Sequence, residues 1–417
     1  MGFITNTTRM WLTRTRQPFT FTPEYDQILP YESCESLGLY VHIPFCKSIC
    51  NFCPYCKELY SKEKCDRYVD ALLREIHMVG HRHHGRKKVT SLYFGGGSPA
   101  LAADRLGEII KTLSQYFEIT DGIGVELHPD NVTAAVLQTL KAAGVTRISI
   151  GIQSFQKCHQ DVLGRAGLNR DHMIAALKEV PFETVSMDLI FALPGQTFET
   201  LKADVDTAFA SGANHVAIYP FIDFTFTASP VKAMEKDEKR ALLDRITTYL
   251  LDKGYHRDSI WTFSSVQGAK YSSMTRETFL GFGCSATTLL RDQFKINTFH
   301  VEEYIRRIEE NKLPTSLTCR FTRHQRMVYW LFWTAYSTHV SEADFEAFFG
   351  VPLKKEYGFE LRLAKRLGFA TEEDGVWSMT LKGAFYYHYY ENFYTLAYID
   401  KMWGIMRKEA FPTGIEL

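Results

Sequence analysis

The sequence has no long hydrophobic run and no excess of charge of either sign. No stretch of its 417 residues approaches 18 uninterrupted apolar residues, so we expect no transmembrane helix and no membrane partner. Lys and Arg together number 48, and so do Asp and Glu. This balance gives no sign of a chain built to coat nucleic acid or an anionic membrane, and we expect no nucleic-acid partner.

The N-terminus also lacks the apolar core of a signal peptide. It carries Arg9, Arg14 and Arg16 with no acidic residue before Glu24, a composition shared by organellar transit peptides. An ordinary N-terminal extension is the simpler interpretation. We therefore expect a cytoplasmic protein.

Short β-branched or apolar segments alternate with helical segments through the first half of the chain. Such alternation is typical of βα units around a parallel sheet. The units fit a partial or full (β/α) barrel of the TIM type, whose active site lies at the carboxyl ends of the strands. Strands are expected at 39–43, 91–96, 124–129, 147–154, 185–194 and 215–222.

The character of the chain changes near residue 300, where long amphipathic segments begin. A helix at 357–369, a short hairpin at 374–380 and a helix at 382–393 follow in a winged-helix-like order. The region is not strongly basic, so the order alone does not indicate DNA binding. We divide the chain into an N-terminal extension, a barrel core and a mostly helical C-terminal domain, at residues 1–37, 38–290 and 300–417.

The chain has nine cysteines, and Cys46, Cys50, Cys53 and Cys56 fall within eleven positions. Disulfides within so tight a run would close strained loops, and close spacing in a chain of this length more often indicates a metal. Soft thiolates select zinc, copper(I) or iron–sulfur clusters. A structural zinc usually takes four ligands in two separated pairs. The first three cysteines, spaced C-x3-C-x2-C, leave one iron of a 4Fe-4S cluster without protein sulfur, as a reactive site requires.

The segment YVHIPFCKSICNFC (40–53) resembles the cluster loop of radical S-adenosylmethionine (SAM) enzymes, specifically of the oxygen-independent coproporphyrinogen III oxidase family. The resemblance covers about residues 38 to 290, with motifs in the order of that family. These are YFGGGSP (93–99), VELHP (125–129), ISIGIQSF (148–155), LGR (163–165), MDLIFALPGQT (187–197) and GFGCSA (281–286).

The resemblance implies a 4Fe-4S cluster bound by Cys46, Cys50 and Cys53, with SAM on the fourth iron. SAM would then be cleaved reductively to methionine and a 5′-deoxyadenosyl radical. It further implies that one set of residues holds this SAM: Tyr40, Phe52, Gly96, Gly97, Ser98, Glu126, Gln153, Arg165 and Asp188. The loop GFGCSATT (281–288), with Gly283 and Thr287, matches the border of a second SAM site. We expect Glu126, Arg165 and Cys56 to take part in catalysis.

Two departures from the family separate this chain from a plain decarboxylase. Cys56 follows Cys53 one residue later than the fourth cysteine of the oxidases does, and His128 stands where they typically have Asp. His42, in the family lead-in, is interpreted first as packing under the loop, and Cys284 as a buried small hydrophobe.

Three functions stay open. The favoured one is a radical reaction on a tetrapyrrole or a comparably large conjugated substrate. The others are class C methylation of an sp2 carbon, in which a second SAM donates the carbon, and a non-catalytic haem chaperone. Forty-five residues precede Cys46, as an enzyme that covers a bulky substrate would need. We expect a monomer that receives electrons from a flavodoxin or ferredoxin.

Overall fold

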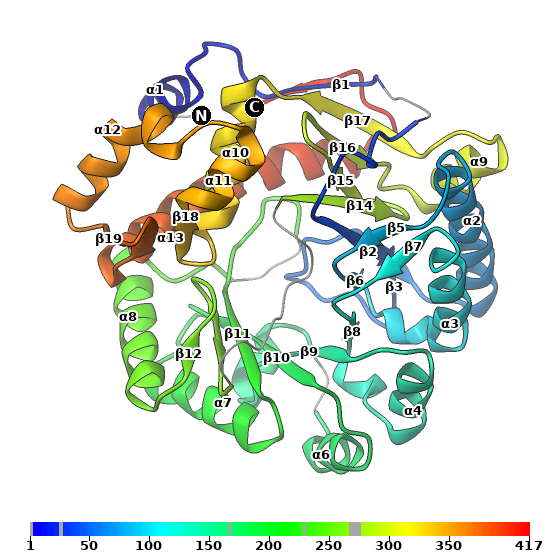
Figure 1. The fold of residues 1–417 in the computed structure, drawn as a ribbon. Coiled ribbons are helices and arrows are strands. Elements are labelled where there is room, and N and C mark those ends of the chain that lie inside the picture. The colour runs from blue at the N-terminus through cyan, green and yellow to red at the C-terminus, as the bar shows by residue number, and fades with distance from the viewer. Residues whose placement is uncertain (1–2, 25–27, 166–167, 228–230, 267–276) are drawn as a thin grey trace.

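The computed structural model describes residues 3–24, 28–165, 168–227, 231–266 and 277–417 (Figure 1). The six expected strands are all present and lie side by side, all parallel, in one sheet. They are β2 (Leu37–Ile43), β6 (Leu92–Gly96), β8 (Ile123–Leu127), β9 (Arg147–Gln153), β10 (Thr184–Phe191) and β11 (His215–Pro220). Both faces of β10 are largely buried, as expected for a parallel strand inside a layer of helices. The predicted α/β barrel is confirmed.

Helices between these strands form the outer ring seen in Figure 1. They are α2 (Lys62–Gly80), α3 (Ala103–Leu113), α4 (Ala134–Ala142), α5 (Lys157–Val162), α6 (Arg170–Glu179), α7 (Phe198–Ala210) and α8 (Lys236–Asp252). Their starts follow local rules: Ser61 caps α2, and Thr197 and Thr200 form a capping box on α7. Short elements complete this half: β3 (Phe45–Cys46), β4 (Glu58–Leu59), β5 (Lys87–Val89), η1 (Pro99–Ala102), β7 (Phe117–Ile119) and η2 (Pro129–Asn131).

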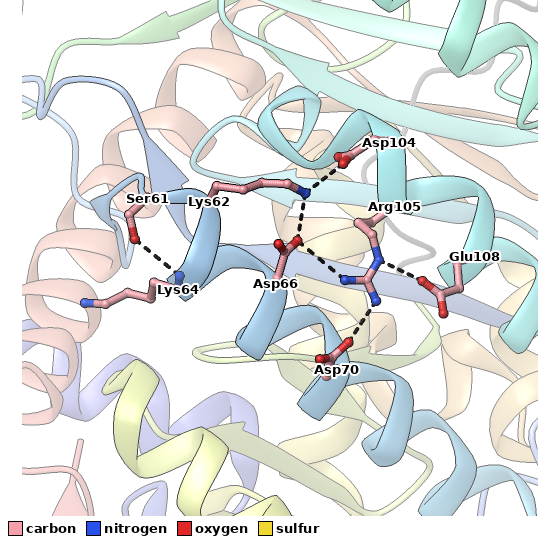
Figure 2. A network of polar contacts seen from close by, with 8 residues as sticks. All are labelled: Ser61, Lys62, Lys64, Asp66, Asp70, Asp104, Arg105 and Glu108. Carbon is pink, nitrogen blue, oxygen red and sulfur yellow. Dashed lines mark hydrogen bonds and ion pairs between the residues drawn. The ribbon is translucent and has the colours of Figure 1, made fainter.

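A polar network joins α2 to α3 on the surface (Figure 2). Lys62 reaches Asp66 at 2.8 Å and Asp104 at 2.7 Å, and Arg105 reaches Asp70 at 2.8 Å. Exposed pairs of this kind add little stability each. They link α2, the helix that follows the cysteine loop, to the neighbouring α3.

The barrel is partial, because the sheet continues with antiparallel strands on both sides of its parallel part. On one side β14 (Thr278–Phe282) runs parallel to β2, and further strands follow it. These are β15 (Thr287–Leu289), β16 (Gln293–Asn297), β17 (Thr315–Arg320), β1 (Thr20–Thr22) and β21 (Ile415–Glu416). On the other side lie β13 (Thr262–Ser264) and β12 (His256–Arg257). Both ends of the chain thus join one sheet edge, and the division at residues 37, 290 and 300 stays a prediction.

The C-terminal region contains the winged-helix-like unit. Its elements are α10 (Arg323–Ala335), β18 (His339–Ser341), α11 (Glu342–Phe349), α12 (Leu353–Arg366), β19 (Ala370–Glu373), β20 (Val376–Met379) and α13 (Leu381–Thr395). Trp330, Phe345 and Tyr357 belong to a small core of its own. The chain then returns to the barrel through a π-helix, η3 (Leu396–Trp403), and α14 (Gly404–Met406). The remaining helices are α1 (Phe3–Thr13) and α9 (Val301–Glu309).

We find no helix in the described segments with both the length and the apolar character needed to cross a lipid bilayer.

Candidate active site

The cysteine loop leaves the end of β2 and is closed by backbone pairing at its two ends. β3 and β4 pair in parallel, and Tyr60 N donates to Cys46 O at 2.9 Å. Inside the loop the Lys57 ammonium donates to Cys50 O at 3.1 Å and to Cys53 O at 2.6 Å. Sequence reasoning missed Lys57, which gave no signal beyond its place after Cys56. Hydrogen bonds within the loop therefore fix its conformation.

Cys46, Cys50 and Cys53 are partly exposed free thiols. Burial, and then the charges of the neighbouring Cys53 and Cys50, raise the pKa of Cys46 to about 12. Three thiolates so close together need a cationic partner, so the donor set fits an iron–sulfur cluster. Within the described residues no three His, Cys, Asp or Glu side chains are arranged around a single ion. A cluster does not require that arrangement, because each thiolate binds a different iron.

Two carboxylates lie near this loop, Glu126 next to the carboxyl end of β8 and Asp188 in the middle of β10. Glu126 Oε2 accepts from Gly96 N at 3.1 Å, and Asp188 Oδ2 accepts from Ser149 Oγ at 2.8 Å. Burial raises the pKa of Asp188 to about 6. Burial, and then the charge of Asp188, raises the pKa of Glu126 to about 7. The two acids are therefore buried close enough for their charges to interact, and no cation of the described residues is among the groups that shift their pKa values, an arrangement that favours a cationic ligand.

Arg165 connects the cysteine loop to the end of β9. Its Nη1 donates to Gly151 O at 2.5 Å, and its guanidinium carbon lies 6.0 Å from the centre of the Phe52 ring. Gln153, at the end of β9, has a φ of 72° and would crowd a Cβ on Gly151. The Arg165 Nε atom is buried and has no hydrogen-bond partner among the described residues. A buried donor of this kind favours an anionic ligand.

His128 lies on the same side of the site as Arg165. Burial, and then the charge of Arg165, lower the pKa of His128 to about 4. The imidazole is therefore neutral near pH 7 and adds no second positive charge beside Arg165.

The glycines after β6 are needed by the packing of the protein itself. Gly96 has a φ of 119°, and a Cβ there would lie 2.7 Å from the His42 ring. A Cβ on Gly97 would meet the Phe45 backbone, with the carbonyl carbon at 2.8 Å. Ser98 Oγ is engaged too, since it donates to Asn131 Oδ1 at 2.8 Å. Contacts of these three residues with SAM stay predictions.

His42 is a packing residue under the loop. Its Nδ1 lies 3.0 Å from Tyr40 Oη, and its Nε2 lies 3.1 Å from Cys56 O. With both ring nitrogens in hydrogen bonds and 3% of its surface exposed, it is not placed to ligate a metal.

The loop after β14 is held from behind by Glu75, which sequence reasoning missed. Glu75 Oε2 accepts from Gly283 N and from Tyr304 Oη, both at 2.7 Å. Burial raises the pKa of Glu75 to about 7. Gly283 is itself buried, whereas Thr287 in β15 is partly exposed. Their contact with a second SAM stays a prediction.

The C-terminal segment reaches back over the cysteine loop, a contact without any sequence signal. Arg407 donates to Pro54 O and, at 2.8 Å, to Tyr55 O. The Trp403 ring packs 5.8 Å from the Tyr55 ring. The end of the chain therefore helps to position the loop.

A barrel of parallel strands, a three-thiol loop after its first strand and charged residues at the strand ends define a radical SAM protein. The profile of the Radical SAM superfamily matches residues 40–208. The heme chaperone HemW of Bacillus subtilis is 27% identical over 306 residues, which cover 69% of this chain and 80% of that protein. The oxygen-independent coproporphyrinogen III oxidase of Cereibacter sphaeroides is 26% identical over 309 residues, 67% of this chain and 68% of that protein.

A solved structure has the same fold over most of its length. The coproporphyrinogen III oxidase of Escherichia coli, a radical SAM enzyme, superposes with a TM-score of 0.76 at 22% identity and covers 88% of this chain and 93% of that one. Residues 40–208 thus match the radical SAM superfamily, and the chain is similar to the oxygen-independent coproporphyrinogen III oxidases and to HemW. Its cofactors are a 4Fe-4S cluster and SAM.

Proposed function

We propose that this chain is a radical SAM enzyme that acts on a tetrapyrrole, with Cys46, Cys50 and Cys53 as the cluster ligands. When the cofactors are bound, the cluster supplies the electron that cleaves SAM, and SAM supplies the 5′-deoxyadenosyl radical that abstracts hydrogen. The loop fixed by Lys57 positions the three thiols, and the C-terminal segment excludes water from one side of it.

One observation carries the proposal: two carboxylates with raised pKa values and an unpaired guanidinium donor face one interior region. SAM carries a cationic sulfonium and ammonium and an anionic carboxylate. Glu126 and Asp188 suit the cationic part, and Arg165 suits an anion. A bound cation would stabilise both carboxylates in their charged form.

The other predicted contacts follow from position. Phe52 lies on the loop, Gln153 ends β9, and Tyr40 lies in the middle of β2, the strand that leads into the loop. We propose that they hold the first SAM together with Gly96, Gly97 and Ser98, and that Gly283 and Thr287 border a second one. Location in the cytoplasm, a monomeric state and electron supply by a flavodoxin or ferredoxin stay predictions.

The relatives support a tetrapyrrole as the ligand, since one named group oxidises coproporphyrinogen III and the other is a heme chaperone. A haem chaperone is the second candidate, favoured by the similarity to HemW.

Three measurements on anaerobically reconstituted full-length protein test the proposal. We expect about four irons per chain, release of 5′-deoxyadenosine on reduction with SAM present, and carbon dioxide from coproporphyrinogen III. An iron-free protein that contains zinc would contradict the proposal that the three cysteines bind an iron–sulfur cluster. Tight haem binding without turnover would favour the chaperone, and label from SAM with a deuterated methyl group in the product would favour methylation.

Variants of Glu126 and Asp188 test whether these two carboxylates bind the cationic part of SAM. Glu126→Gln and Asp188→Asn should weaken SAM binding at least about tenfold, because each removes a charge that pairs with a cation. Glu63→Gln, on the exposed first turn of α2, is the matched control and should bind SAM as the wild type does. Equal SAM affinity in all four proteins would contradict the proposed site.

A further inference from the structure

Cys56 and Cys284, far apart in the sequence, lie side by side in the structure. Their sulfurs are 3.8 Å apart. Cys56 comes from the end of the cysteine loop, and Cys284 from the turn that follows β14. They are 6% and 0% exposed, respectively. Neither residue is among the three predicted cluster ligands, so the cofactor accounts for neither thiol.

Both sulfurs contact the same short backbone segment. Cys56 Sγ lies 3.1 Å from Phe299 O and Cys284 Sγ lies 3.1 Å from Thr298 O, and these two carbonyls belong to successive residues. The pair therefore rests on a single short segment, which restricts how far the sulfurs can separate.

The backbones of the two cysteines are also anchored to a shared pair of side chains. His42 Nε2 lies 3.1 Å from Cys56 O, and Cys284 N donates to Tyr68 Oη at 2.9 Å. Tyr68 Oη in turn donates to His42 O at 2.7 Å. The two positions are thus fixed relative to each other before any bond forms.

The geometry needs only a small change to reach a covalent bond. A disulfide has an S–S distance of about 2.05 Å, so the sulfurs must approach by a little under about 2 Å in total. Rotation of the two side chains about their Cα–Cβ bonds is the movement that would bring the sulfurs together. The other cysteines outside the loop are on separate elements: Cys34 before β2, Cys65 on α2, Cys158 on α5 and Cys319 on β17.

We propose that Cys56 and Cys284 form a redox-active dithiol that hydrogen peroxide converts to an intrachain disulfide. The Cys56 sulfur, the more exposed of the two, attacks the peroxide and becomes a sulfenic acid with release of water. The Cys284 sulfur then attacks the Cys56 sulfur, and the hydroxyl leaves as a second water with the Cys284 proton. Two thiols lose two electrons and two protons, and one peroxide is reduced to two waters.

The contact between the thiols supports this order of reaction. It lowers the pKa of Cys56, whereas burial and then the same contact raise the pKa of Cys284. Cys56 is therefore the better nucleophile. The bond would join the end of the cysteine loop to the turn after β14. Its attachment point on the loop, Cys56, is only three residues beyond Cys53. Oxidation would thus restrain the loop that carries the cluster ligands.

Peptide mapping of the full-length, cluster-loaded protein tests the proposal. The protein is treated anaerobically with one equivalent of hydrogen peroxide, alkylated while unfolding and digested with trypsin. Cys56 falls in peptide 48–57 and Cys284 in peptide 277–291. We expect a cross-link between these peptides, assigned to Cys56 by fragmentation and reversed by dithiothreitol. At least about tenfold less should form in Cys56→Ser, where only Cys50 and Cys53 of that peptide remain.

Cys65→Ser, a buried cysteine of α2, is the matched control and should give as much cross-link as the wild type. Alkylated Cys56 and Cys284 after peroxide treatment would overturn the proposal. A cross-link that persists in Cys56→Ser would overturn it as well, since it would come from a released cluster ligand. Mapping of the wild-type chain decides the question even where a variant fails to fold. It is independent of substrate turnover.

Discussion

A methyl group added at Gly97 should displace the first cluster ligand. In Gly97→Ala the new Cβ would lie 2.8 Å from the Phe45 carbonyl carbon and 2.9 Å from Phe45 N. These are backbone atoms and cannot rotate away as a flexible side chain can. The strand Phe45–Cys46 must therefore move outward by several tenths of an ångström, and Cys46 moves with it.

The cost follows from the contacts at that point. Overpacking of a tight interior typically costs about 1–3 kcal/mol. The shift also strains two hydrogen bonds, Gly97 N to Ile43 O at 2.8 Å and Ser98 N to Phe45 O at 2.7 Å, each worth about 1 kcal/mol. We expect the free energy of unfolding to fall by about 2–5 kcal/mol, as measured by urea denaturation of the cluster-free chain.

Iron content after anaerobic reconstitution is the second measurement, and it should fall in Gly97→Ala because Cys46 is displaced. Gly350→Ala is the matched control: Gly350 has a φ of 69° with nothing near its Cβ position, so this variant carries backbone strain alone, about 1–2 kcal/mol. Its iron content should be that of the wild type. A Gly97→Ala protein that binds full iron and loses no more stability than Gly350→Ala would refute the reasoning.

Three further outcomes are expected. The pKa of Glu126 is raised to about 7 in the folded protein. Between about pH 4.5 and 7 the native protein therefore keeps a proton on Glu126 that the unfolded chain releases. The free energy of unfolding falls as the pH rises through that range. Glu126→Gln should therefore be about 2–3 kcal/mol more stable than the wild type at pH 8 and equal to it at pH 4.5, by urea denaturation of the cluster-free chain. Arg407→Ala should lose iron to a chelator faster than the wild type, because the loop loses its two carbonyl contacts, whereas the exposed Lys408→Ala should not. Lys57→Met should take up less iron at equal helix content by circular dichroism, and equal iron would show that the loop needs no ammonium.

The barrel strands could be predicted because their signals are local. The expected strand at 147–154 became Arg147–Gln153, and the one at 91–96 became Leu92–Gly96, since apolar runs ended by polar or glycine residues mark both. The order of helices and hairpin in the C-terminal region was readable for the same reason. The pairing of β1 with β17 and β21 was not, because it joins distant parts of the chain without a local signal.

The site shows the same limit. The three cluster cysteines lie in one short loop, so spacing was enough to propose them. The contact of Cys56 with Cys284 and the reach of Arg407 over Pro54 depend on how distant segments fold back. Gly96 and Gly97 were predicted as contacts of SAM, and the sequence did not show that His42 and Phe45 of the chain itself already leave no room for a Cβ at these two positions.

The carboxylates link the stability of this site to its ligand. The pKa of Glu126 is about 7 instead of 4.5, which corresponds to about 3 kcal/mol against the charged form near and above neutral pH. Burial is the larger cause and the charge of Asp188 the second, so a ligand cation placed between the two acids would offset both. At high pH the free protein is therefore less stable than a variant without the buried acid would be. A bound cation would recover the free energy that is lost when the buried Glu126 is charged. This is why Glu126→Gln should gain stability and lose SAM affinity together, an outcome that a purely structural carboxylate would not give.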